Sequence, residues 1–158
     1  MKTVDVAVIG AGVMGAEHAR ILASDVAGAH LVAVADADLS RAEAVGQGAR
    51  PTSDALALIA DPAVEAVLVA SPDATHHRLV LAAIAAGKPV LCEKPLATST
   101  AECLEIVAAE QHAGRPLVQT GFMRRFDPAY RELKATLDSR ALGAVRILHC
   151  QHRNAAAP

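Results

Sequence analysis

Three glycines near the start of the chain have the spacing of a phosphate-binding turn. Gly10, Gly12 and Gly15 form the pattern G-x-G-x-x-G in the stretch VAVIGAGVMGAEHA. The pattern follows an apolar run at residues 4–9, which predicts a strand, and it opens a predicted helix at residues 13–24. Gly10 allows a tight turn, Gly12 lets the backbone approach a pyrophosphate, and Gly15 lets helix and strand pack closely. The free N–H groups at the start of the helix then face the phosphates.

Asp36 supplies a second signal for the same ligand. It follows the apolar run at residues 31–35, about 20 positions beyond the glycine turn. A carboxylate there accepts hydrogen bonds from the hydroxyls of an adenosine ribose and repels a 2′-phosphate, which favours NAD over NADP. Arg41 keeps NADP as the less favoured alternative, since a nearby arginine can serve a 2′-phosphate. We assign Val13 and Met14, inside the glycine turn, to the same cofactor site.

The rest of the chain repeats the alternation of strand and helix up to about residue 120. The apolar runs are nearly continuous, as expected for strands that are covered on both faces. This alternation predicts an α/β fold with a doubly wound parallel sheet, a Rossmann dinucleotide-binding domain. The predicted strands are residues 4–9, 31–35, 66–70, 89–92 and 117–120, and the predicted helices are residues 13–24, 40–45, 54–59, 76–86, 101–112 and 128–139. A further strand is predicted at residues 144–153, where it begins a second domain.

Composition excludes several classes of partner. A net charge of -2 predicts no basic patch, so neither nucleic acid nor an anionic membrane is expected as a partner. No apolar run approaches the roughly 20 residues that span a bilayer. Cys92, Cys103 and Cys150 fit no metal spacing and no disulfide framework, and they predict the reduced thiols of a cytoplasmic protein.

Four residues that could line a ligand site fall just past the ends of predicted strands. They are Ser71, Glu93, Lys94 and Gly121. Because ligands of open parallel sheets bind beyond the carboxyl ends of the strands, we expect these residues to converge with the glycine turn. A lysine there can donate a hydrogen bond to a substrate oxygen, although a surface lysine in a loop remains the alternative. We predict a cis peptide bond before Pro95, which would aim the lysine into the crevice.

The histidines do not predict a metal site. His76 and His77 are adjacent, so only one of them can face the crevice. His149 and His152 are three apart on a predicted strand and point to opposite faces, whereas zinc needs three or four convergent ligands. His18 is expected to be solvated or peripheral.

The stretches GAGVMGAEHA, VADADLSRAE, VASPDATHHRLVLAAIAAGKPVLCEKPLA and QTGFMRRFDPAY resemble the Gfo/Idh/MocA oxidoreductases over essentially the whole chain. The EKP motif after SPDATHH is the most specific of these signals. Within the family, GFMRRFDPAY and the terminal HRNA are most similar to the inositol dehydrogenases. The chain looks like the N-terminal part of such a protein.

The resemblance implies roles for individual residues. Ser71, Pro72 and His76 are similar to the segment that lines the nicotinamide half of the cofactor. Glu93 and Lys94 match the family's EKP signature beside the nicotinamide, and its lysine is the catalytic residue that hydrogen-bonds the reacting hydroxyl of the substrate.

The resemblance also implies an organisation in two domains. Residues 1–121 are expected to form the NAD-binding domain, and residues 122–158 to begin an α+β substrate and oligomerisation domain. Arg124 looks like a residue that contacts the cofactor or the substrate, with Arg125 as the alternative, because the sequence does not show which of two neighbours points inward.

The function implied is NAD-dependent oxidation of a secondary alcohol of a cyclic polyol or sugar, by hydride transfer to nicotinamide. In similar family members the proton acceptor is a histidine paired with an aspartate in the second domain, beyond Pro158. This chain would carry the cofactor half of a protein that forms a homo-oligomer. Two alternatives stay open, a non-catalytic NAD-binding module and another sugar oxidoreductase of the same family.

Overall fold

The structure is a computed structural model that describes residues 2–151. The chain divides into two compact units, Met1–Gly121 and Phe122–Pro158. All three aromatic residues of the chain, Phe122, Phe126 and Tyr130, belong to the second unit. The predicted role of that unit, the beginning of a substrate and oligomerisation domain, stays a prediction.

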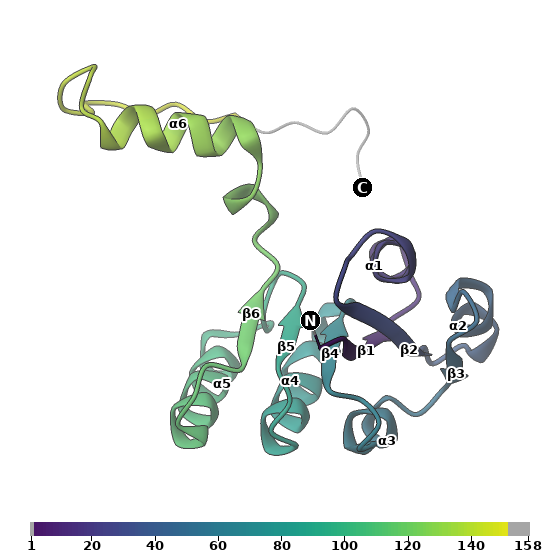
Figure 1. The fold of residues 1–158 in the computed structure, drawn as a ribbon. Helices are drawn as coiled ribbons and strands as arrows, with labels where there is room; N and C mark the ends of the chain where they lie inside the picture. Colours follow the sequence, from purple (N-terminus) through teal and green to yellow (C-terminus); the bar gives the residue numbers. More distant parts are fainter. Residues whose placement is uncertain (1, 152–158) are drawn as a thin grey trace. The chain divides into compact units, whose positions relative to one another are not determined.

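The first unit is built on one six-stranded sheet in the order β3-β2-β1-β4-β5-β6 (Figure 1). Every neighbouring pair of strands is parallel, so all the strands end at the same edge. The strand order reverses between β1 and β4, which is where open sheets of this kind bind their ligands. The strands are β1 (Val4–Ile9), β2 (Ala29–Ala35), β3 (Arg50–Thr52), β4 (Ala66–Val69), β5 (Val90–Cys92) and β6 (Val118–Thr120).

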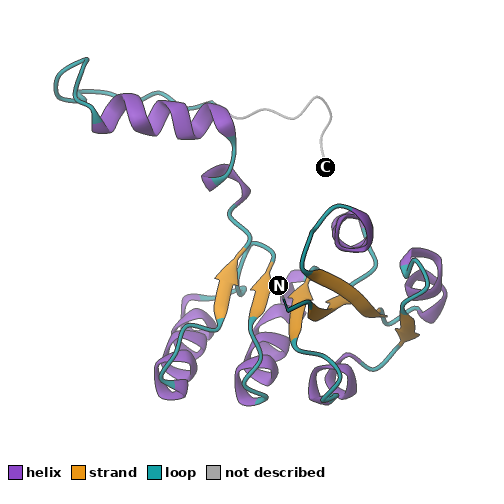
Figure 2. Cartoon of the chain, viewed as in Figure 1, coloured by secondary structure: helices purple, strands orange, loops and turns teal. Residues whose placement is uncertain are grey.

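Helices cover both faces of the sheet, as Figures 1 and 2 show. The first two helices pack on one face and the next three on the other, and each face has its own cluster of buried side chains. The predicted doubly wound α/β fold is therefore confirmed. The helices are α1 (Val13–Ser24), α2 (Leu39–Val45), α3 (Ala55–Ala60), α4 (His76–Ala85), α5 (Thr100–Ala113) and α6 (Pro128–Asp138), with short 3-10 turns η1 (Asp73–Thr75) and η2 (Met123–Arg125).

The continuous apolar runs follow from burial on both faces. Along β1, Ala7 and Ile9 pack toward α3, α4 and α5, whereas Val8 packs toward α1 and α2. Successive side chains of a strand point to opposite faces, so a strand between two helical layers has no position that favours a polar residue. Alanine on the strands, such as the fully buried Ala33, lets the helices approach closely.

The short strand β3 was missed by the sequence analysis. Its sequence is Arg-Pro-Thr, and it lies at the edge of the sheet beside β2. Proline is tolerated at a sheet edge because its missing N–H removes no bond from a central ladder. These three residues, one of them a proline, contain no apolar run that would predict a strand. They are recognised as a strand only by their pairing with β2.

The second unit differs from its prediction in one element. Helix α6 begins as predicted, with the Asp127 side chain accepting a hydrogen bond from the Ala129 N–H and Pro128 in the first turn. Within residues 144–151, however, the structure forms no strand, so the predicted strand at residues 144–153 is wrong over its described part. An alternating pattern needs a neighbouring strand to complete its hydrogen bonds, and the described part of this unit supplies none. His152 lies outside the described residues.

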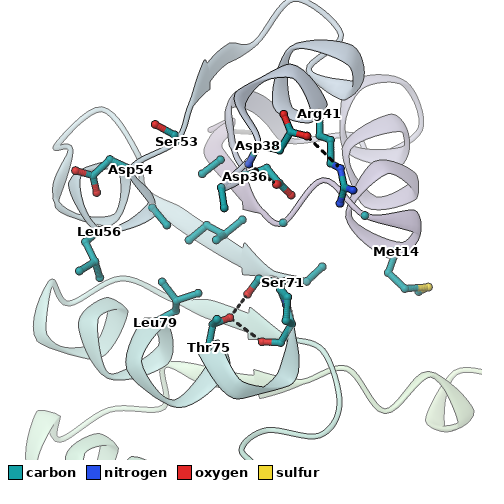
Figure 3. Close-up of a pocket in the computed structure, with 18 of the residues that line it drawn as sticks. Met14, Asp36, Asp38, Arg41, Ser53, Asp54, Leu56, Ser71, Thr75 and Leu79 are labelled. Carbon is teal, nitrogen blue, oxygen red and sulfur yellow. Dashed lines mark hydrogen bonds and ion pairs between the residues drawn. The ribbon is translucent and has the colours of Figure 1, made fainter.

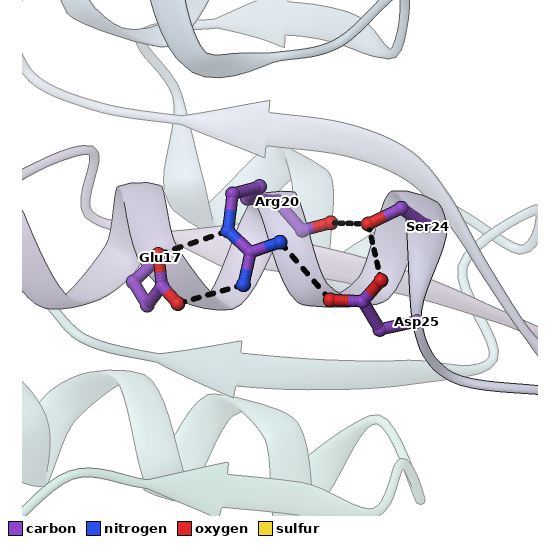
Figure 4. Close-up of polar contacts among 4 residues, drawn as sticks. All are labelled: Glu17, Arg20, Ser24 and Asp25. Carbon is purple, nitrogen blue, oxygen red and sulfur yellow. Dashed lines mark hydrogen bonds and ion pairs between the residues drawn. The ribbon is translucent and has the colours of Figure 1, made fainter.

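The outer face of α1 carries a polar network. The Arg20 guanidinium hydrogen-bonds both Glu17 and Asp25, and the Ser24 hydroxyl donates to the Arg20 carbonyl oxygen (Figure 4). The bond from Arg20 holds the pKa of Glu17 below its usual value. These side chains are half exposed, so the network contributes little to stability.

A capping box begins α5 and fixes the exit of the loop after β5. The Ser99 hydroxyl accepts from the Glu102 N–H at 3.2 Å, and the Glu102 carboxylate accepts from the Ser99 N–H at 3.0 Å. The same carboxylate accepts from the N–H and the hydroxyl of Thr98, and the bond from that hydroxyl is the main cause of its lowered pKa. The segment between β5 and α5 is thus anchored at its far end.

Replacing Ser99 with alanine should lower the free energy of unfolding by about 1 kcal/mol, because one N–H of the first turn loses its acceptor. Urea unfolding followed by circular dichroism measures the change. The control is Thr3→Ala, which deletes a hydroxyl at an exposed position ahead of β1. Equal stability of Ser99→Ala and the natural protein would show that the cap contributes nothing.

Candidate functional site

A cavity of about 1090 Å³ lies beyond the carboxyl ends of β1, β2 and β4 (Figure 3). This volume is slightly above the range of about 300–1,000 Å³ that is usual for ligand sites. The loops after these three strands form most of its wall, with side chains from the start of α3 and from α4 completing it. The predicted site residues among its lining are Gly10, Gly12, Val13, Met14, Asp36, Ser71 and Pro72.

Two of the three glycines are required by the packing of the protein itself. Gly10 has φ of +98°, and a Cβ there would lie 2.6 Å from the backbone of Ala70 and Ser71. A Cβ on Gly15 would lie 1.7 Å from the carbonyl oxygen of Gly10, so only glycine lets α1 start this close to β1. These contacts agree with the tight turn and the close helix packing expected from the sequence.

Gly12 is a different case. A Cβ on Gly12 would meet no protein atom within 4 Å, and the residue lines the cavity. Protein packing therefore does not demand glycine here, and the missing side chain leaves the backbone of the turn accessible from the cavity. Gly12 is also the N-cap of α1, and no side-chain bond caps this end of the helix. The first N–H groups of α1 are left for an anion at the cavity.

The Asp36 carboxylate ties two walls of the cavity together. One oxygen accepts from the Ala11 N–H at 2.7 Å, and the other accepts from the Asp38 N–H at 2.9 Å. Each carboxylate oxygen has two lone pairs, so each can still accept a hydrogen bond from a ribose hydroxyl. The carboxylate is thus fixed by the backbone before any ligand binds.

Arg41 lines the same end of the cavity but is engaged by a carboxylate. Its Nε lies 3.6 Å from Asp38 Oδ2. The Asp38 side chain also caps α2 by accepting from the Ser40 N–H at 3.1 Å. Hydrogen bonding by the Ser40 hydroxyl is the main cause that lowers the pKa of Asp38. Two carboxylates, of Asp36 and Asp38, and one arginine therefore line this end of the cavity.

The loop after β4 is held by Thr75, which the sequence analysis missed. The Thr75 hydroxyl donates to the Pro72 carbonyl oxygen at 2.7 Å, and it lies 2.6 Å from the Ser71 hydroxyl (Figure 3). Since the threonine proton is used on the proline carbonyl, the Ser71 hydroxyl donates to Thr75 Oγ1. The sequence did carry a signal for this contact, namely a threonine four residues after a serine with a proline between them.

His76 is completely buried and is not among the residues that line the cavity. Its Nδ1 lies 2.7 Å from the Pro95 carbonyl oxygen, and its Nε2 lies 2.9 Å from the Ser71 carbonyl oxygen. The adjacent His77 instead places its Nε2 2.9 Å from the Glu105 carboxylate on α5. The contact of His76 with a cofactor, expected from the sequence, stays a prediction.

The segment after β5 places Glu93 against α1. Glu93 Oε1 lies 2.9 Å from His18 Nε2, and the two side chains are only 12% and 24% exposed. The expectation that His18 is solvated or peripheral is therefore wrong. No local pattern connects the two residues, because their contact arises only when α1 packs beside the end of β5. Cys92, just before Glu93, is buried, and burial raises the pKa of its thiol to about 12.

Lys94 is exposed and does not line the cavity in this structure. The peptide bond between Lys94 and Pro95 is cis, as predicted. The catalytic role of the lysine and its contact with a cofactor remain predictions.

The predicted substrate residue Arg124 makes its contacts within the second unit. Its Nη1 donates to Asp127 Oδ2 at 2.7 Å, and its guanidinium lies 5.2 Å from the centre of the Tyr130 ring. The contact with Arg124 is the main cause that lowers the pKa of Asp127. Whether Arg124 or Arg125 meets a substrate stays a prediction.

Residues 2–151 hold neither a metal-binding cluster nor a membrane-spanning helix. No group of three histidine, cysteine, aspartate or glutamate side chains in this range could hold a metal ion. Among the helices of the same range, none is both long and apolar enough to cross a membrane.

Comparison with known proteins agrees with this geometry. The model of the Gfo/Idh/MocA family, described as an oxidoreductase family with an NAD-binding Rossmann fold, matches residues 4–122. The chain belongs to this family. The NAD cofactor expected from the sequence agrees with the description of the family.

Curated relatives point to one branch of the family. The chain is 55% identical to inositol 2-dehydrogenase 2 of Saccharopolyspora erythraea, over 99% of this chain and 47% of the relative. It is 54% identical to inositol 2-dehydrogenase of Acidothermus cellulolyticus, again over 99% of this chain and 47% of the relative. The chain therefore spans about half the length of these relatives.

A solved structure extends the comparison. The crystal structure of myo-inositol dehydrogenase from Lactobacillus casei, in complex with NAD(H) and myo-inositol, matches with a TM-score of 0.86 at 39% identity. The match covers 90% of this chain and 43% of that protein.

Gly12→Ala and Gly15→Ala should affect different properties of the protein. Gly15→Ala should lower the free energy of unfolding by about 1–3 kcal/mol or more, because its methyl group collides with the Gly10 carbonyl. Gly12→Ala should change that free energy by no more than about 1 kcal/mol but weaken NAD binding at least about tenfold. Thermal unfolding and titration calorimetry measure the two quantities. Unchanged NAD binding by Gly12→Ala would contradict the assignment of the glycine turn.

Replacing Asp36 with alanine should weaken NAD binding and narrow the preference for NAD over NADP. The ribose loses an acceptor and a 2′-phosphate loses a repelling charge, so we expect a loss of about tenfold for NAD. The control is Asp25→Ala, which removes a carboxylate at the far end of α1. If the natural protein already binds NADP more tightly than NAD, the assignment of Asp36 is wrong.

Proposed function

We propose that this chain is the cofactor-binding half of an NAD-dependent dehydrogenase that oxidises a secondary alcohol of a cyclic polyol, of the inositol 2-dehydrogenase kind. The observation that carries the proposal is Gly12, a glycine that faces open cavity and not protein. Beside it lie the uncapped start of α1 and the fixed carboxylate of Asp36. The similarity to inositol 2-dehydrogenases over nearly the whole chain supports the choice of substrate class.

The residues of the cavity fit the parts of a dinucleotide in order. The N–H groups at the start of α1 suit the pyrophosphate, and Asp36 suits the hydroxyls of the adenosine ribose. Ser71 and Pro72, at the end of β4, suit the nicotinamide half, in keeping with the family resemblance. When bound, NAD would supply the acceptor for the hydride that leaves the alcohol carbon.

Lys94 is the residue of this chain that we assign to the reacting alcohol. Its ammonium can donate a hydrogen bond to the hydroxyl oxygen and stabilise negative charge there as the proton leaves. No described residue of this chain is assigned as the proton acceptor. In the full-length form we assign that role to a histidine and aspartate pair of the substrate domain, and we assign Arg124 to substrate contact.

The wider properties follow from the same proposal. The full-length protein would form a homo-oligomer, act in the cytoplasm and bind neither nucleic acid nor membrane. A non-catalytic NAD-binding module is the competing function.

Two measurements test the proposed function. Titration calorimetry of the 158-residue chain with NAD⁺ should show saturable binding. The full-length protein encoded by the reading frame that contains this chain should form NADH with myo-inositol, followed by absorbance. Lys94→Ala should slow that reaction about 100-fold, as is usual when a donor to a developing oxyanion is lost.

The matched control is Lys88→Ala, which removes a lysine from the opposite end of β5 and should leave the rate unchanged. NAD⁺ binding without reduction by myo-inositol or other cyclic polyols would favour the non-catalytic module. Absence of NAD⁺ binding would overturn both functions.

A further inference from the structure

Lys94 is exposed, yet both of its neighbours in the chain are anchored by histidines from other elements. Glu93 is held by His18 of α1, and Pro95 is held by His76 of α4. We infer that His18 and His76 are positioning residues that fix the segment Glu93–Lys94–Pro95, and through it Lys94, beside the nicotinamide half of the cavity. This inference rests on the proposed NAD site.

The first anchor is the Glu93 carboxylate. Its Oε1 lies 2.9 Å from His18 Nε2, and both side chains are largely shielded from water. A Cβ on Gly121, at the end of β6, would lie 3.2 Å from all three atoms of the carboxylate. The carboxylate is therefore confined between α1 and the end of β6. Because the same α1 begins at the glycine turn, this bond couples Lys94 to the pyrophosphate end of the site.

The second anchor is the His76 imidazole, which has no exposed surface. Its two ring nitrogens contact the carbonyl oxygens of Pro95 and Ser71, at 2.7 and 2.9 Å. A neutral imidazole carries one N–H and donates to one of these carbonyls, whereas an imidazolium donates to both. In either form the ring lies between the loop after β4 and the loop after β5 and donates to at least one of their two carbonyls. Ser71 lines the cavity, so His76 lies between the cavity wall and Pro95, the residue that follows Lys94.

The two anchors act on opposite sides of one residue. A flexible lysine side chain can be placed reproducibly only if its own backbone is fixed, and here the residues before and after it are both fixed. Two other histidines do not share this arrangement. His77 contacts Glu105 on α5, and His30 contacts Asp5, a pair that is half exposed. These two residues therefore serve as matched controls.

The test compares the binding of NADH with the binding of ADP by the 158-residue chain. ADP carries the adenosine and phosphate parts of the cofactor but no nicotinamide, so it reports on the glycine turn and Asp36 alone. His18→Ala and His76→Phe should weaken NADH binding about tenfold, the effect of one lost buried hydrogen bond, and ADP binding much less. His18→Gln and His76→Gln keep a donor and should recover part of the loss.

The controls His77→Ala and His30→Ala should change neither affinity. A double-mutant cycle then asks whether the histidines act through the lysine. In a Lys94→Ala background, His18→Ala and His76→Phe should lower the affinity for NADH by clearly less than in the natural protein. The reason is that the lysine which the two histidines position is then absent.

Three results would count against the inference. Equal losses of NADH and ADP affinity would show a general structural role, unchanged NADH affinity would show no role, and full additivity with Lys94→Ala would show an independent one. If His76→Phe does not fold, His18→Ala carries the comparison. A natural protein that binds neither NADH nor ADP would instead remove the proposed NAD site itself.

Discussion

The approach of α1 to the turn after β1 is the contact on which the site depends. At Gly15 the helix passes so close to the Gly10 carbonyl that no side chain fits between them. This closeness places the uncapped end of α1 at the edge where the strands end. Gly10 in turn passes close to the backbone after β4, so two glycines fix the relative positions of two cavity walls.

The polar groups of the cavity wall hold one another in place. Asp36 ties the glycine turn to the loop after β2, and Thr75 closes the loop after β4 on itself. Most of these bonds use backbone N–H or carbonyl groups, so the wall is organised by the fold and not by a ligand. A preorganised wall spends less binding free energy on ordering loops, which leaves more for the ligand.

The parts of the fold and of the cavity that could be predicted from the sequence are those with local sequence signals. The strands and helices of the first unit carry apolar runs, glycines and prolines that act within a few residues, and the sequence predicted them closely. Strand β3 has no such signal, and residues 144–151 have a strand pattern without a partner. The cavity residues Gly12 and Asp36 were predicted because their spacing is local. The contact of His18 with Glu93 joins distant parts of the chain and depends on packing alone.

The placement of the aromatic residues separates the two units optically. Phe122, Phe126 and Tyr130 all lie in the second unit, and the chain contains no tryptophan. Tyrosine emission and the near-ultraviolet circular dichroism of aromatic side chains therefore report on the second unit alone. The far-ultraviolet signal comes mainly from the backbone of the larger first unit. Unfolding of the two units can be followed separately in one sample, without any added label.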